Sequence, residues 1–248
     1  MKKILIISIL IFIGCDDTDN TLESEQELGW FEFNCSEDYV ELWGTYYDIE
    51  NTTELDIEDN SLTGVIPNHI SCLTNLTYLH LEGQLTGKIP SEIGNLTNLT
   101  YLDLHYNQLS GEIPSEIGNL INLTELHLNG NQLSGEIPSE IGNLINLTNL
   151  DLNNNQLTGE IPSEIGNLIN LETLSLYNNQ LTGEISSSIG NLINLESLIL
   201  HYNQLTGDIP SEICNILIKN IRYNQFCPPY PDCISQEEID SQDTSECP

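Results

Sequence analysis

The chain repeats one pattern of about 24 residues along roughly two thirds of its 248 residues. The clearest copy is LINLTELHLNGNQLSGEIPSEIGN at residues 120–143, and the next copy follows without a gap. Successive copies begin at Ile49, Leu73, Leu96, Leu120, Leu144, Leu168 and Leu192. A repeat of this length is one supersecondary unit that buries its apolar side only by stacking on its neighbours. The period therefore predicts one solenoid domain.

Each copy predicts a short strand followed by a turn. In the third copy, alternation around Leu102 and Leu104 predicts a strand at residues 101–105 with both leucines facing inward. An asparagine recurs in the turn, and we expect its amide to satisfy backbone groups of adjacent coils rather than to bind a ligand. This column comprises Asn60, Asn107, Asn131, Asn155, Asn179, Asn203 and Asn224.

The second copy departs from the pattern. Its segment LEGQL at residues 81–85 lacks the asparagine and is one residue short. Because neighbouring strands pair residue by residue, we expect a local defect in the strand ladder at this coil.

The second half of each copy, LxGxIPxxIGNL, resembles the leucine-rich repeats of plant receptor-like kinase ectodomains and polygalacturonase-inhibiting proteins. Examples are LTGKIPSEIGNL from Leu85 and LTGDIPSEICNI from Leu205, and one copy has Ser186 in place of the proline. The resemblance covers residues 49–215. It implies an α/β-type repeat solenoid, a horseshoe or superhelix with a parallel β-sheet on a concave face that binds peptides, proteins or glycans. Nothing resembling a kinase follows, so kinase activity is not implied.

Residues 1–14 are typical of a lipoprotein signal peptide. Lys2 and Lys3 precede an apolar run that is too short to span a bilayer. The run ends in IFIGC, which resembles a bacterial lipobox and makes Cys15 the predicted lipidation site. We expect a lipid-anchored protein of the bacterial cell envelope, at the outer membrane or cell surface, with a secreted protein as the alternative. Which membrane and which face it occupies stay open.

The other segments predict a tether and two caps. Residues 15–29 are acidic and poor in apolar side chains, as in a flexible tether. Residues 30–48 are rich in aromatic side chains and predict an N-terminal cap on the repeats. Residues 216–248 predict a partial last repeat and a cysteine-rich cap.

Six further cysteines lie near the two ends of the repeat region and predict disulfide-linked caps, because an even number in an exported chain is typical of disulfides. They are Cys35, Cys72, Cys214, Cys227, Cys233 and Cys247. The first two form the natural N-terminal pair, and the last four allow three connectivities between which the sequence does not choose. A zinc site in the C-terminal cap is a minor alternative that the missing CxxC spacing disfavours.

Acidic residues outnumber basic ones by 38 to 5, which gives a formal net charge of −33. Such a surface repels nucleic acid and anionic lipid headgroups, so neither is an expected partner. Two acidic columns outside the strands are expected to be solvated, with a Ca²⁺-dependent contact as the alternative. They are Glu92, Glu116, Glu140, Glu164 and Glu212, and Glu112, Glu136, Glu160, Glu184 and Asp208.

Strand residues that alternate with the buried leucines form two columns on the concave face. The inner column is Asp56, His80, Asp103, His127, Asp151, Ser175 and Ile199, and the outer column is Glu58, Glu82, His105, Asn129, Asn153, Tyr177 and His201. Tyr78, Tyr101, Tyr106, Tyr202 and Tyr223 flank them. We use "concave face" for these two columns and the flanking tyrosines. Strands lie about 4.8 Å apart, so the inner column places histidine between aspartates on adjacent coils.

Three interpretations of this face stay open. The first is cross-strand Asp–His pairing that offsets carboxylate repulsion without any ligand. The second is ligand binding by exposed aromatic and polar side chains on a rigid sheet. Its predicted residues are Tyr78, His80, Tyr101, Asp103, His105, Tyr106, His127, Asp151, Tyr177, His201 and Tyr202. The third is a divalent metal held by His80, Asp103 and His127, although ligands on flat strands seldom converge; we therefore expect neither a metal nor a cofactor.

No catalytic motif accompanies the Asp–His pattern. GxSxG, HExxH and Gly-rich phosphate loops are absent from the sequence. Ser175 is two coils beyond His127, about 10 Å by strand spacing, which is too far for a triad. We therefore expect a non-enzymatic extracytoplasmic recognition or adhesion module. The alternatives are a passive spacer of the envelope and an inhibitor of an extracellular enzyme.

Overall fold

The computed structural model describes residues 35 and 38–247, and the side chain of Asn60 is not described. The predicted signal peptide, Cys15 and the acidic tether lie outside the described residues and stay predictions. No helix within the described ranges is both long and apolar enough to cross a bilayer.

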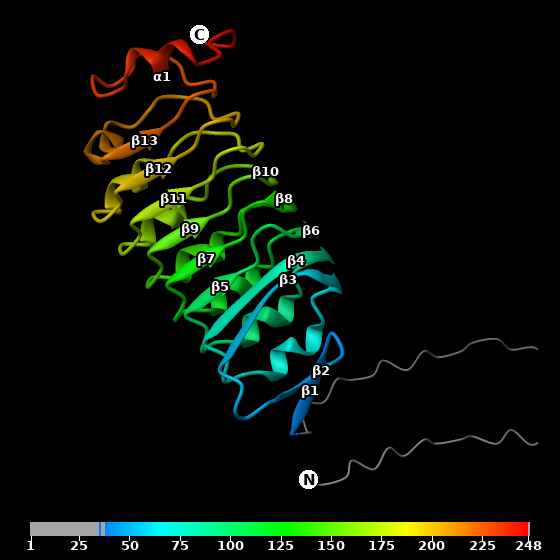
Figure 1. Cartoon of the computed structure of the whole chain (residues 1–248). Helices are drawn as coiled ribbons and strands as arrows, with labels where there is room; N and C mark the ends of the chain where they lie inside the picture. The colour runs from blue at the N-terminus through cyan, green and yellow to red at the C-terminus, as the bar shows by residue number, and fades with distance from the viewer. Residues whose placement is uncertain (1–34, 36–37, 248) are drawn as a thin grey trace, which may run out of the picture. The chain divides into compact units, whose positions relative to one another are not determined.

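The strands of successive coils lie side by side in one parallel ladder (Figure 1). It comprises β3 (Glu54–Val65), β4 (Tyr78–Gly87), β5 (Tyr101–Asp103), β7 (Glu125–His127), β9 (Asn149–Asp151), β11 (Thr173–Ser175), β12 (Ser197–Ile199) and β13 (Ile218–Asn220). Equivalent residues pair, so that Asp103 lies opposite His80 on one side and His127 on the other. The predicted inner column is therefore confirmed along its whole length, and the outer column is paired at Glu58 and Glu82. The strand β5 ends at Asp103, before the predicted end at residue 105, because the chain turns at Tyr106, whose φ is 49°.

A second ladder, which the repeat pattern did not predict, runs along another edge of the coils. It joins β4 to β6 (Gln108–Gly111), β8 (Gln132–Glu136) and β10 (Gln156–Thr158). The remaining side of each coil carries a 3-10 helix. These helices are η1 (Asn68–Cys72), η2 (Ser91–Asn95), η3 (Ser115–Asn119), η4 (Ser139–Asn143), η5 (Ser163–Asn167), η6 (Ser187–Asn191) and η7 (Ser211–Asn215). Repeated helical segments are thus present, but as 3-10 rather than α-helix.

The proline and the glycine of the IPSEIGN segment are each required for a different structural reason. Pro138 precedes η4 with φ −64°, the angle that its ring fixes, and it has no N–H to leave unpaired there. At Gly142 an added Cβ would lie 2.6 Å from the carbonyl oxygen of Glu164 in the next coil. Only glycine therefore allows the 3-10 helices to pack this closely.

The asparagine column has the predicted structural role. Asn155 is buried; its Oδ1 accepts the Leu133 N–H at 3.0 Å, and its Nδ2 donates to the carbonyls of Leu128 and Leu152 at 3.0 and 3.1 Å. Asn107, Asn131, Asn179, Asn203 and Asn224 repeat this arrangement. Side-chain amides thus replace main-chain partners inside every turn of the described column.

The expected defect at the second copy is present. The pairing of β3 with β4 shifts register between Glu58 and Thr63. Without the turn residues of the other copies, β4 stays extended from Tyr78 to Gly87 and connects the two ladders. Glu82 therefore lies inside a strand, beside the coil that carries His105.

Disulfides tie both ends of the repeat region. The predicted pair Cys35–Cys72 is confirmed. Among the three C-terminal possibilities, the structure contains Cys214–Cys233 and Cys227–Cys247. The N-terminal cap is the antiparallel hairpin β1 (Tyr39–Leu42) and β2 (Thr45–Asp48).

The C-terminal cap contains a helix that the cysteine pattern did not predict. Helix α1 (Gln236–Asp240) begins at a capping box in which Ser235 and Glu238 bond each other's backbone N–H groups. The S-x-x-E spacing was the signal that could have predicted this helix.

Candidate ligand-binding face

Two aromatic clusters occupy the concave face. In the N-terminal cluster Tyr78 stacks on Tyr101, with ring centroids 4.5 Å apart, and His80 lies parallel to His105 at 5.5 Å. His127 is tilted against Tyr101 at 5.7 Å. The rings follow the coil spacing, so stacking orders side chains that would otherwise be mobile on a sheet surface.

The C-terminal cluster is smaller and more neutral. Tyr177 stacks on His201 at 4.6 Å, and Tyr202 stacks on Tyr223 at 4.4 Å. His201 links the two stacks through an edge contact with Tyr202 at 5.3 Å. Burial, with a smaller effect of Arg222, lowers the pKa of His201 below its usual value, which favours the neutral imidazole.

Three tyrosines of the face adopt left-handed backbone conformations. Tyr106, Tyr202 and Tyr223 have φ of 49°, 58° and 55°, and Asn154 and Asn178 occupy the same position in other coils with φ of 54° and 55°. This region is disfavoured for bulky residues, whereas asparagine tolerates it. Because the left-handed conformation recurs at this position from coil to coil, with Gly130 at φ 69° as well, it belongs to the turn of the repeat. Sequence reasoning missed this feature, because the consensus alone does not give φ.

The tyrosines at this position remain largely exposed. Tyr106 is 62% exposed and Tyr202 is 51% exposed. The ring of Tyr106 lies over Gly130, where an added Cβ would be 2.5 Å from its Cδ1. A bulkier residue at position 130 would displace the ring, so the Tyr106 ring can pack over the backbone of the next coil only because residue 130 is glycine.

A polar network separates the two aromatic clusters. Asn153 donates to the Asp151 carboxylate and, at 3.1 Å, to Ser175 Oγ. Asn154 Nδ2 donates to the hydroxyl oxygen of Tyr177 at 3.1 Å. Burial raises the pKa of Asp151, while the hydrogen bonds from Asn153 oppose that effect. The centre of the face is therefore a preorganised set of donors and acceptors.

The predicted alternation of Asp and His gives one Asp–His pair between adjacent coils. His80 Nδ1 lies 2.9 Å from Asp56 Oδ1 in the preceding coil. Asp103, however, bonds His105 within its own coil at 2.6 Å, and His127 pairs with Glu125 at 3.1 Å. Glu125 and His127 lie two apart on β7 and point to the same side of the strand, and the Asp103 carboxylate also accepts the backbone N–H of His105 just past the end of β5, so partners within a coil compete with partners across coils. Of the two histidines in the predicted alternation, His80 therefore pairs with only one of its neighbouring aspartates. His127 pairs with Glu125 of its own coil but stays near enough to Asp151 to lower the pKa of that carboxyl, against the larger effect of burial.

The third interpretation also fails in its original form. His80, Asp103 and His127 do not form a group able to hold one ion, because Asp103 and His127 face other partners. In the described part of the chain, groups of three or more such side chains occur on the concave face as His80, Glu82 and His105, and as Asp56, Glu58 and His80. The two acidic columns outside the strands contain none of them.

The tyrosine hydroxyls of the N-terminal cluster stay protonated and can donate hydrogen bonds. Tyr101 donates its hydroxyl to Asp103 Oδ2 at 3.0 Å. Burial, followed by the charge of Asp103, raises the pKa of Tyr101 far above its usual value, and burial also raises the pKa of Tyr78. The hydroxyls of Ser175 and Tyr177 accept hydrogen bonds from Asn153 and Asn154.

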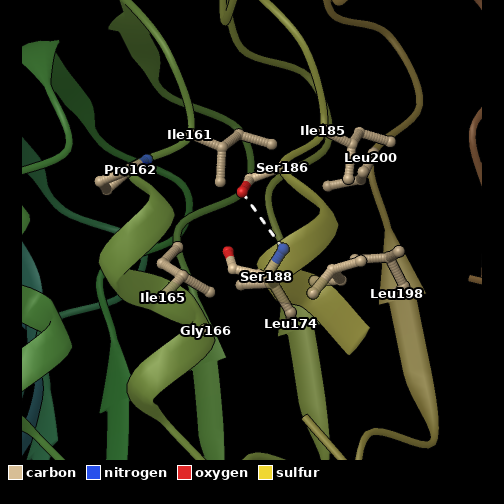
Figure 2. Close-up of a pocket in the computed structure, with 11 residues that line it drawn as sticks. Ile161, Pro162, Ile165, Gly166, Leu174, Ile185, Ser186, Ser188, Leu198 and Leu200 are labelled. Carbon is tan, nitrogen blue, oxygen red and sulfur yellow. Dashed lines mark hydrogen bonds between the residues drawn. The ribbon is translucent and has the colours of Figure 1, made fainter. Parts of the chain in front are cut away.

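The small cavity in Figure 2 lies elsewhere and is a packing defect. It forms where Ser186 and Ser188 replace Pro and Glu of the repeat, and Ser186 Oγ accepts the Ser188 N–H at 3.2 Å. Its volume is about 20 Å³, and it is lined mainly by apolar side chains such as Ile161 and Leu198. A space of this size holds no more than about one water molecule.

Family models assign leucine-rich repeats to most of the described chain. A leucine-rich repeat region matches residues 48–156, a model of two leucine-rich repeats matches residues 145–190, and a single leucine-rich repeat matches residues 194–216. No protein among the curated sequences matches the chain.

Solved leucine-rich-repeat structures share the fold and confirm the predicted fold class. The ectodomain of the receptor kinase GASSHO1/SCHENGEN3 from Arabidopsis thaliana, in complex with CASPARIAN STRIP INTEGRITY FACTOR 2, is 41% identical with a TM-score of 0.71 and aligns over 75% of this chain and 23% of its own. The Arabidopsis receptor kinase HAESA, in complex with the peptide hormone IDA and a co-receptor, is 36% identical with a TM-score of 0.68, over 74% and 32%. A leucine-rich-repeat protein of Leptospira interrogans is 39% identical with a TM-score of 0.58, over 66% and 41%. The chain spans about a quarter to a third of the plant receptor chains.

Proposed function

We propose that this chain, whose residues 48–216 carry leucine-rich repeats, is a non-catalytic module that binds an extended peptide segment of a partner protein across its concave face. The observation that carries the proposal is the pair of ordered aromatic clusters on either side of a polar network. Aromatic platforms supply contact area at low entropic cost, and preformed amides supply directional hydrogen bonds. The similar HAESA ectodomain, which was solved in complex with the peptide hormone IDA, supports the same proposal.

The spacing of the clusters suits a short extended segment. Five strand-to-strand steps separate β4, which carries Tyr78, from β12, which precedes Tyr202. At about 4.8 Å per step the span is about 24 Å, which an extended peptide covers with about seven residues.

The uneven distribution of charge along the concave face would orient a bound peptide. Asp56, Glu58, Glu82 and Glu125 gather around the N-terminal cluster, whereas Arg222 lies near the C-terminal cluster and pairs with Glu237 at 2.7 Å. A ligand with basic residues at one end would therefore place that end over β3–β7.

The module is proposed to work outside the cytoplasm. Three disulfides in the described residues support export, because they persist in oxidising compartments. Lipidation at Cys15 and display on the bacterial envelope rest on the sequence of residues 1–15. Palmitate labelling of wild type and of Cys15→Ser tests the anchor, and loss of label only in the variant is expected. Protease treatment of intact cells then tests surface exposure.

The binding test is a screen of the purified chain against displayed peptides, with a glycan array in parallel. The informative variant is Tyr106→Asn with Tyr202→Asn, because asparagine already occupies this left-handed position at Asn154 and Asn178. Removing two aromatic anchors should weaken peptide binding by at least about tenfold. Circular dichroism and the melting temperature check that this double variant stays folded.

A matched control uses exposed apolar residues away from the concave face. Ile145, Ile169 and Ile193 are 54%, 53% and 83% exposed in consecutive coils, and their replacement with serine should leave peptide affinity unchanged. Loss of binding in this control but not in the tyrosine variant overturns the proposed face. Binding of glycans alone, or of nothing, overturns the peptide proposal, and the latter outcome favours a passive spacer. A bound peptide that comes from an extracellular enzyme would favour the inhibitor alternative.

A further inference from the structure

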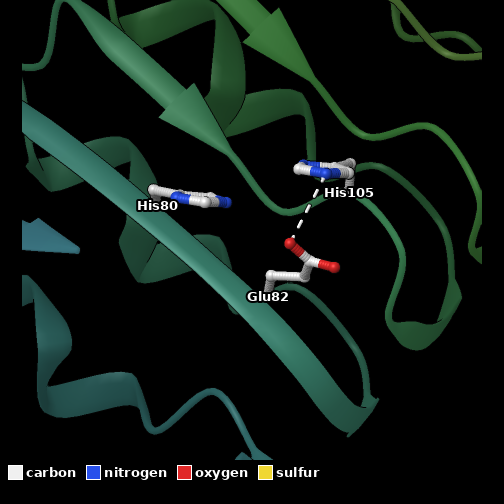
Figure 3. A group of neighbouring side chains, drawn as sticks. All are labelled: His80, Glu82 and His105. Atoms are coloured by element: carbon white, nitrogen blue, oxygen red, sulfur yellow. Dashed lines mark ion pairs between the residues drawn. The ribbon is translucent and has the colours of Figure 1, made fainter. Parts of the chain in front are cut away.

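A histidine pair and a glutamate converge on the concave face beside the shortened second coil. His80 and Glu82 lie on β4, and His105 follows β5 in the next coil. One ligand atom from each lies within 4.8 Å of the others. Figure 3 shows the two imidazole rings parallel, with the Glu82 carboxylate directed toward His105, whose Nε2 is 3.8 Å from Glu82 Oε2.

Both histidines are oriented by a carboxylate on the other ring nitrogen. His80 Nδ1 lies 2.9 Å from Asp56, and His105 Nδ1 lies 2.6 Å from Asp103. Asp103 is itself held by the Tyr101 hydroxyl at 3.0 Å. When Nδ1 donates its proton to a carboxylate, Nε2 of the neutral ring keeps a lone pair, which is the usual arrangement of a metal-binding histidine.

One of these lone pairs is buried without a partner. His80 is only 5% exposed, and its Nε2 has no hydrogen-bond partner. Such an atom loses its hydration on folding and is explained in native proteins by an ion, a water molecule or a functional role. The alternative of two charged imidazolium rings leaves a buried N–H at Nε2 without an acceptor and places two like charges in parallel rings.

We propose that His80 Nε2, Glu82 and His105 Nε2 form a binding site for a transition-metal dication such as Zn²⁺. Two imidazole nitrogens and one carboxylate suit Zn²⁺, whereas Ca²⁺ and Mg²⁺ prefer all-oxygen sites. A tetrahedral ion with bonds of about 2.0–2.1 Å needs donor atoms about 3.3 Å apart. Because each Nε2 lone pair lies in its ring plane, binding requires the half-buried His105 ring to rotate out of its parallel arrangement with the buried His80 ring, and the Glu82 carboxylate to move inward. Three protein ligands leave the fourth position open toward the concave face.

The group around Nδ1 of His80 is a weaker candidate for a metal site than the group around Nε2. Asp56 and Glu58 also surround this Nδ1 atom, but their side chains are 58% and 70% exposed and Nδ1 already has a hydrogen-bond partner. The Asp56 and Asp103 carboxylates, which hold the Nδ1 atoms of the two histidines, instead lower the electrostatic cost of a dication at the Nε2 side. The shortened coil contributes as well, because it keeps Glu82 extended on β4.

The test measures Zn²⁺ alone on the untagged, disulfide-bonded protein after chelator treatment, by calorimetry in physiological salt with excess Mg²⁺ to occupy diffuse acidic sites. One equivalent should bind with micromolar or tighter affinity. His105→Gln and Glu82→Gln should each abolish this binding, and Asp103→Asn should weaken it by about 10- to 100-fold. Cobalt(II) bound at the same site should show the intense visible absorption of tetrahedral coordination, which variants lacking a ligand lose.

Two matched controls come from the same columns. Glu58→Gln removes the register partner of Glu82, and His127→Gln removes a histidine already paired with Glu125. Both variants should keep affinity within about twofold. The proposal is overturned if wild type does not bind Zn²⁺, if Glu82→Gln and His105→Gln still bind it, or if the control variants lose it equally. None of these outcomes depends on a peptide, so the metal site and the proposed function fail or succeed separately.

Discussion

Replacing Asn155 by alanine should destabilise the central coils by about 2–4 kcal/mol. The Leu133 N–H, whose residue is fully buried, loses its acceptor at 3.0 Å. An orphaned buried donor costs about 1–3 kcal/mol. The carbonyls of Leu128 and Leu152 lose a donor but keep a second one, from Asn131 and Asn179. Their combined loss is therefore smaller, about 1 kcal/mol.

Two further variants separate the hydrogen bonds from mere loss of side-chain volume. Asn155→Asp keeps an oxygen for the Leu133 N–H but points a carboxylate at two carbonyl oxygens, so we expect at least as large a loss of stability. Asn129→Ala removes a half-buried asparagine of the concave face and should change the unfolding free energy by less than about 0.5 kcal/mol.

The assay is urea unfolding followed by far-UV circular dichroism, with the disulfides oxidised, together with amide hydrogen exchange at Leu133. The exchange measurement locates the lost bond, because protection at that amide should fall in Asn155→Ala and persist in Asn129→Ala. An unfolding free energy of Asn155→Ala within about 1 kcal/mol of wild type would refute the ladder as a source of stability.

Two other perturbations test the face and the C-terminal cap. Because burial raises the pKa of Asp151, the folded state binds its proton more readily, and the protein loses stability as pH rises above the usual value of 3.8. Asp151→Asn should therefore be more stable than wild type at pH 7, with an advantage that disappears below about pH 3.8 in parallel urea titrations; lower stability of the variant at pH 7 would contradict this. Removing the disulfide with Cys214→Ser and Cys233→Ser, 19 residues apart, should cost about 3 kcal/mol, measured in the same assay. A cost below about 1 kcal/mol would show that the cap holds its shape without the cross-link.

The repeat pattern by itself determines which residues stand side by side in the ladder. A period of about 24 residues returns each residue to the same place in the next coil, so the columns of Leu102, Asp103 and Asn107 could be assigned by counting. The one-residue deficit at 81–85 likewise located the register shift. These features depend on backbone pairing and burial, which recur identically along the chain.

Only the tertiary structure decided which side chains act together. Each charged residue of the concave face has possible hydrogen-bonding partners two positions away in its own coil and in the adjacent coils, at similar distances. Asp103 therefore bonds His105 rather than His80 or His127, although all three choices agree with the sequence. The tertiary structure likewise selects the C-terminal disulfide pairs and brings His80, Glu82 and His105 together. A repeat places equivalent residues, but rotamers and local burial select among neighbours that the repeat makes equally near.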